Sequence, residues 1–135
     1  MHRSWWLPAL CLLVTAGCGT RVPEVPRSEP ISYAAHLEPL VIARCLGCHE
    51  ADEPEADLVL EAGRGYAALV GPRSVQKPSM ALVAPGDPEA SYLWLKLQHR
   101  APHGKGMPRT LTGTKRFRPD ELELYRRWIE GGAKP

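Results

Sequence analysis

The sequence predicts an all-α domain built from several short helices joined by loops. Apolar residues recur at the three-to-four-residue spacing of a helix face in three segments, at residues 31–49, 88–99 and 119–132. No segment alternates apolar and polar residues as a half-buried strand does, and no internal repeat is visible. The length of 135 residues suits one domain with a modest core.

The first helix is expected to lead into residue 49. Its apolar stripe lies between Leu37 and Cys45, and Pro39 interrupts it. Proline fits the first turn of a helix but disrupts a helix interior. We therefore expect either a kink at Pro39 or a helix that begins near Glu38.

Two helices are predicted in the middle of the chain. A weak helical pattern runs through "RGYAALVG", residues 64–71, and ends at the Gly-Pro pair there. Asp87 is a typical N-cap residue, and the Pro-Glu pair after it suits a first helical turn. Together these residues predict a helix over 88–99.

The last helix is predicted to begin at Pro119, which suits the first helical position. Gly131 and Gly132 are typical of a C-terminal stop. Trp128 lies on the apolar stripe of this helix, so we expect it to pack against the first helix.

The N-terminus has the pattern of an export signal. A basic residue precedes an uncharged apolar run that ends in small residues directly before Cys18. The run is shorter than the roughly 20 apolar residues of a membrane-spanning helix. Its end resembles the lipobox of bacterial lipoproteins, although Thr15 stands where that family usually has an aliphatic residue. We predict a signal peptide at 1–17, with ordinary signal cleavage and an uncleaved membrane helix as alternatives.

Lipidation of Cys18 would make this an exported, periplasmic protein anchored to a bacterial membrane. Residues 18–30 hold three prolines and no periodic apolar face, so they are predicted to form a semi-extended tether. Residues 31–135 are predicted to form the folded domain. Once the signal peptide is removed, Cys45 and Cys48 are the only thiols left unmodified.

The motif "CLGCH" places Cys45, Cys48 and His49 within five positions. A redox dithiol normally follows a strand in a βαβ pattern, which is missing here. A zinc site could combine the two cysteines with one or two of His49, His99 and His103. The adjacent Cys48 and His49 would rarely face one ion, which disfavours it. Covalent haem attachment uses both thiols as thioethers and the next histidine as an axial ligand. We favour haem and keep the other two as alternatives.

A haem in an electron carrier usually takes a sixth ligand from methionine or histidine. Met107 lies between Gly106, which lets the backbone come close to the ring, and Pro108, which stiffens the chain. His103 is the main rival in the same loop. Met80 sits among apolar residues and is interpreted as a core or loop residue. An open coordination site is the third alternative.

Three stretches of the sequence resemble a known family. They are "CLGCH" with Met107 in "GMP", "LVAPGDPEASYLWLKL" at 82–97 and "DELELYRRWIEGGA" at 120–133. Over about residues 31–133 the chain resembles a small class I-type monohaem cytochrome c. It is similar to the exported bacterial cytochrome c domains that are common in planctomycetes and myxobacteria.

The resemblance implies a small cytochrome c fold, in which short helices and loops wrap around one covalently attached haem c. It also implies that the first and last helices cross. By this match Cys45 and Cys48 form the thioethers, His49 is the proximal ligand and Met107 the distal ligand. The stretch "TLTGTKRFRPDE" departs from the family, because it makes the loop after Met107 longer and more basic.

These features predict an electron-transfer protein rather than an enzyme. We expect redox proteins as partners, a membrane reached through the lipid, and a monomer. A five-coordinate haem sensor or peroxidase-like protein is the first alternative, and a non-haem zinc or dithiol interaction module is the second. The 17 basic and 15 acidic side chains give a net charge of +2, which argues against nucleic acid as a partner.

Basic residues gather around the predicted ligand loop. They either form a solvated surface or steer an acidic redox partner to an exposed haem edge. The residues are Lys105, Arg109, Lys115, Arg116 and Arg118.

Overall fold

The computed structural model describes residues 22–110 and 113–135. The predicted signal peptide at 1–17 and the predicted lipidation site Cys18 lie outside the described residues. In the part of the chain that is described, no helix has both the length and the apolar character needed to cross a bilayer.

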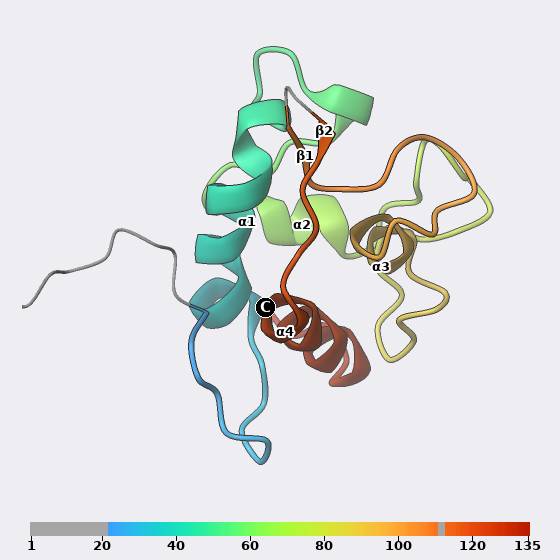
Figure 1. Ribbon diagram of the computed structural model, residues 1–135. Helices are drawn as coiled ribbons and strands as arrows, with labels where there is room; N and C mark the ends of the chain where they lie inside the picture. The colour runs from blue at the N-terminus through green and yellow to red at the C-terminus, as the bar shows by residue number, and fades with distance from the viewer. Residues whose placement is uncertain (1–21, 111–112) are drawn as a thin grey trace, which may run out of the picture.

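The described chain is mostly helical, which confirms the predicted all-α class (Figure 1). In chain order the helical elements are a π-helical turn η1 (Tyr33–Leu37), α1 (Glu38–Cys45), two 3₁₀ turns η2 (Leu46–Cys48) and η3 (Glu55–Asp57), α2 (Gly65–Leu69), α3 (Tyr92–Leu97) and α4 (Pro119–Glu130). A two-residue antiparallel ladder, β1 (Arg109–Thr110) with β2 (Gly113–Thr114), was not predicted and lies in the longer loop after Met107.

The first helix begins as η1 and continues directly into α1. Ser32 is the N-cap, and its Oγ accepts a hydrogen bond of 3.3 Å from the backbone N–H of Ala35. Pro39 lies in the first turn of α1, as predicted, directly after the π-helical turn. The helix ends at Cys45, so the first cysteine of the motif is its last residue.

The prediction that a helix starts just after Asp87 was wrong, because α3 begins only at Tyr92. Asp87 caps a single turn instead, and its Oδ1 accepts the N–H of Ala90 at 3.0 Å. Ser91 then takes an extended conformation, with its Oγ accepting the N–H of Ala84 at 2.8 Å. This contact with an earlier segment interrupts the helix that the local sequence favours.

The core is centred on the contact between η1 and α4. Trp128 is fully buried, and its ring centroid lies 5.6 Å from that of Tyr33, so the predicted packing against the first helix is confirmed. The indole N–H of Trp128 donates to the carbonyl of Lys134 at 2.7 Å. Figure 1 shows α4 crossing the first helix near its N-terminal end, where η1 lies.

Part of the predicted tether is bound to the domain. The guanidinium of Arg127, on α4, donates to the carbonyls of Val25 at 2.8 Å, Pro26 at 2.7 Å and Glu29 at 2.9 Å. The side chains of Val22 and Val25 also pack against the core. These residues are therefore held along α4 as they approach the first helix.

Candidate functional site

A cavity of about 910 Å³ opens between the first helix, α3 and the loops that follow them. This volume is near the upper end of ordinary small-molecule sites. Among its lining residues are Cys45, Cys48, His49 and Met107, which come from two distant parts of the sequence. The folded chain therefore brings all four predicted haem-binding residues to one cavity.

The two cysteines reach the cavity because α1 is followed at once by the 3₁₀ turn η2. Side chains three residues apart point the same way in a 3₁₀ turn, and Cys45 and Cys48 have this spacing. Cys45 is half-buried and Cys48 is exposed, and neither forms a disulfide. Burial raises the pKa of the Cys45 thiol to about 12, whereas a reactive dithiol needs a lowered pKa.

His49 is buried, with 6% of its surface exposed. Its Nδ1 lies 3.1 Å from the carbonyl oxygen of Leu58, which can only accept a hydrogen bond, so Nδ1 is assigned the proton. That tautomer leaves the lone pair of Nε2 available as a metal ligand. Burial also lowers the pKa of His49, which favours the neutral ring that binds metals.

Met107 is held at the cavity by its own backbone. Its N–H donates to the carbonyl of Lys96 in α3 at 2.9 Å, and its half-buried side chain packs against the core. A Cβ atom on Gly106 would lie 2.4 Å from the ring of His99. Glycine at position 106 therefore allows the chain to pass close to His99, just after the end of α3.

The rival ligands do not line the cavity. His103 is exposed, Met80 lies elsewhere, and the Nε2 atom of His99 is buried without a hydrogen-bond partner. In residues 22–110 and 113–135, no three His, Cys, Asp or Glu side chains gather as a metal set. The described chain thus does not assemble the zinc site that Cys45, Cys48 and the histidines could have formed.

Sequence analysis missed Lys96, a buried residue that also lines the cavity. Its Nζ donates to the carbonyls of His103 at 2.9 Å and Lys105 at 3.0 Å, and lies 5.2 Å from the centroid of the Tyr92 ring. Burial lowers the pKa of the Lys96 ammonium. The available signal was its position between Leu93 and Leu97, where a helical stripe should be apolar.

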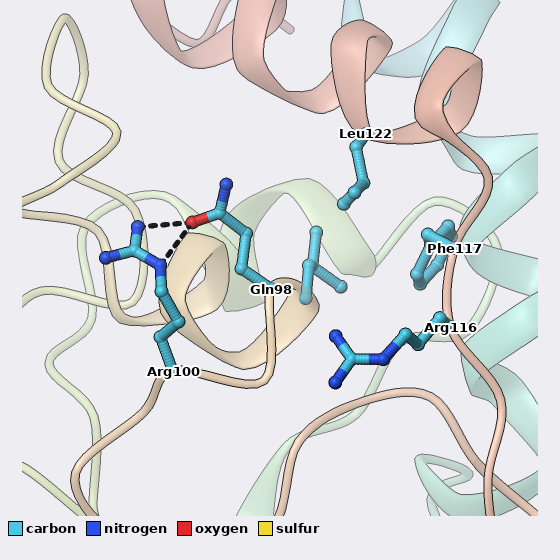
Figure 2. Close-up of a pocket in the computed structure, with 6 residues that line it drawn as sticks. Gln98, Arg100, Arg116, Phe117 and Leu122 are labelled. Atoms are coloured by element: carbon cyan, nitrogen blue, oxygen red, sulfur yellow. Dashed lines mark hydrogen bonds between the residues drawn. The ribbon is translucent and has the colours of Figure 1, made fainter.

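The side chains of the predicted basic cluster are exposed, but they lie at different places on the domain. Arg109 lines the large cavity. Arg118 pairs with Asp120 at 3.1 Å beside the start of α4. Arg116 lies beside Phe117 at a separate shallow pocket, as Figure 2 shows. The cluster therefore does not form one continuous rim around the cavity.

The fold is that of a small, mostly helical domain, and its cavity is lined by Cys45, Cys48, His49 and Met107. Residues 45–109 match the family model described as planctomycete cytochrome C. The matched stretch is 65 of the 135 residues, and it contains both cysteines of the motif, His49 and Met107. This stretch is therefore similar to that cytochrome c family.

The solved structures supply independent support for the fold. The chain is similar to hydrazine synthase from Kuenenia stuttgartiensis, with a TM-score of 0.53 and 21% sequence identity. The likeness covers 76% of this chain but only 16% of that chain, so this chain spans about a sixth of the larger one. A search among curated proteins finds no match. The predicted cytochrome c fold is confirmed.

Proposed function

We propose that the protein carries one covalently bound haem c and acts as an electron carrier rather than an enzyme. The observation that supports this most strongly is the convergence of Cys45, Cys48, His49 and Met107 on one cavity of about 910 Å³. Thioether formation by both cysteines would fix the porphyrin edge at the end of α1. His49 and Met107 would then be its axial ligands.

The donor set fits this cofactor. His49 offers a neutral imidazole whose orientation is set by the carbonyl of Leu58, and Met107 offers a thioether sulfur on a loop fastened to α3. When bound, the haem iron supplies a one-electron redox couple, with a potential higher under histidine–methionine than under bis-histidine ligation. The contacts that hold His49 and Met107 in place would allow electron transfer with little rearrangement of these two ligands.

Replacement of Met107 by alanine tests the axial ligand. The ferric holoprotein, produced with a cytochrome c maturation system, should show the weak near-infrared absorption band of a methionine–iron bond. In Met107→Ala we expect this band to disappear and the ferrous protein to bind carbon monoxide readily. The side chain of Met107 is the one methionine sulfur on the described cavity wall.

Met80→Ala is the matched control, because Met80 is not among the cavity-lining residues, and it should retain the band. Persistence of the band in Met107→Ala would contradict the assignment. A wild-type protein with attached haem but no band would instead support the five-coordinate sensor or peroxidase-like alternative.

We further propose that the protein is exported and tethered by a lipid on Cys18, with redox proteins of the same membrane as partners. The apolar run and small residues before Cys18 support this. Cys18→Ser should release most of the protein from the membrane fraction, because a lipid chain is the anchor. Cell fractionation and the mass of the N-terminal peptide measure this outcome. An unmodified Cys18 in wild-type protein would overturn the proposal.

A further inference from the structure

The loop that carries Met107 is fastened to α3 by side chains as well as by backbone. Lys96 Nζ donates to the carbonyls of His103 and Lys105, and the hydroxyl of Tyr92 donates to the same His103 carbonyl at 2.6 Å. The Met107 N–H returns a bond to the Lys96 carbonyl. One residue of α3 thus holds the loop at three points, the last of which is Met107 itself.

We propose that Lys96 is a positioning residue that keeps the sulfur of Met107 at the haem cavity, with Tyr92 as a second and weaker fastening. This inference rests on the proposed function, because it assigns a role towards the distal ligand. Lys96 does not touch the iron in this scheme. It acts through the loop.

The buried ammonium of Lys96 makes its polar contacts with the loop that carries Met107. Lysine is rarely buried unless a charged partner compensates it. In the described part of the chain no carboxylate forms an ion pair with Lys96, and its polar contacts are the two loop carbonyls. Only these bonds and the face of the Tyr92 ring offset the desolvation of the ammonium. The charge of Lys96 is therefore stabilised mainly by the loop that carries Met107 and by Tyr92.

Gly104 leaves room for the Lys96 ammonium because it has no side chain. A Cβ atom at this position would lie 2.6 Å from Lys96 Nζ, and the φ of Gly104 is +65°. A larger residue here would displace the Lys96 ammonium, and the positive φ favours glycine. The glycine therefore allows the lysine to reach beneath the loop, in addition to giving the loop conformational freedom.

Lys96→Met tests the proposal in the holoprotein, because methionine keeps most of the stem volume and removes all three donors. We expect haem to remain attached and the near-infrared band to weaken. Carbon monoxide should bind the ferrous protein at least about tenfold faster, the lower limit for losing one charge-assisted hydrogen bond. Tyr92→Phe should shift both readouts in the same direction by a smaller factor. Lys134→Met, which removes an exposed lysine outside the cavity lining, should match wild type.

The double variant Lys96→Met/Met107→Ala separates positioning from a general structural role. If Lys96 acts through Met107, the double variant binds carbon monoxide no faster than Met107→Ala alone. A further acceleration in the double variant would overturn the proposal. An undiminished band in Lys96→Met, together with a wild-type rate of carbon monoxide binding, would also overturn the proposal. The proposed function would then remain intact. If Lys96→Met does not fold, Tyr92→Phe decides through the same two readouts. A wild-type protein without the band would overturn the proposed function and this inference together.

Discussion

Replacing both Cys45 and Cys48 by serine should give a protein with no covalently attached haem and a largely lost native fold. Serine cannot form a thioether, so attachment is abolished completely. The cavity of about 910 Å³ is large for a domain with a modest core, and apolar side chains such as Leu60 and Leu97 line it. Without a covalently held cofactor these apolar walls would face water or collapse.

Haem staining after denaturing electrophoresis measures attachment, and near-ultraviolet circular dichroism measures the loss of fixed packing. The single variants Cys45→Ser and Cys48→Ser are the matched controls, because each keeps one thioether and should retain stained haem. A double variant that is free of haem yet unfolds with the wild-type transition would show that the fold does not depend on the cofactor. That result would weaken the proposed function.

Arg44→Met should destabilise the holoprotein by breaking a buried ion pair. Arg44 Nη2 lies 2.5 Å from Glu121 Oε1, and the Glu121 side chain is only 1% exposed. The other carboxylate oxygen accepts the backbone N–H of Arg118 at 2.8 Å, which remains in the variant. We therefore expect a loss of about 3 kcal/mol, the lower end of the range for removing one partner of a buried pair. Urea unfolding of the holoprotein measures it.

Arg126→Met is the matched control for this substitution. Arg126 pairs with Glu123 at 2.8 Å and Glu130 at 2.6 Å, but its side chain is 38% exposed. Surface pairs of this kind contribute about 0–1 kcal/mol. Adding Glu121→Leu to Arg44→Met should recover part of the loss, because the buried carboxylate, whose remaining cation is the more distant Arg118 Nη2 at 3.8 Å, is then removed. Equal destabilisation by Arg44→Met and Arg126→Met would refute the importance of the buried pair.

Elements with strong local signals could be predicted from the sequence. Pro119 and Gly131 mark the ends of α4, and Pro39 marks the start of α1, because their effects act within one helical turn. The start of α3 could not be predicted, since Ser91 is drawn out of the helix by its bond to Ala84 in an earlier segment. Such contacts are set by the tertiary fold rather than by neighbouring residues.

The candidate site divides in the same way. Cys45, Cys48 and His49 lie within five residues, so their common location follows from the sequence alone. Met107 reaches the cavity, and His103 does not, because of bonds between its loop and α3. Lys96 makes the side-chain part of those bonds, and an isolated lysine in a helical stripe does not reveal which carbonyls it will meet.

The contacts of Arg127 with Val25, Pro26 and Glu29 limit how far the domain can travel from a bilayer. If Cys18 carries the lipid, three residues, 19–21, separate it from Val22, whose side chain already packs against the core. Three residues span at most about 10 Å. The domain would move close to the membrane surface, within about its own diameter, and would meet partners whose redox centres lie just above the headgroups.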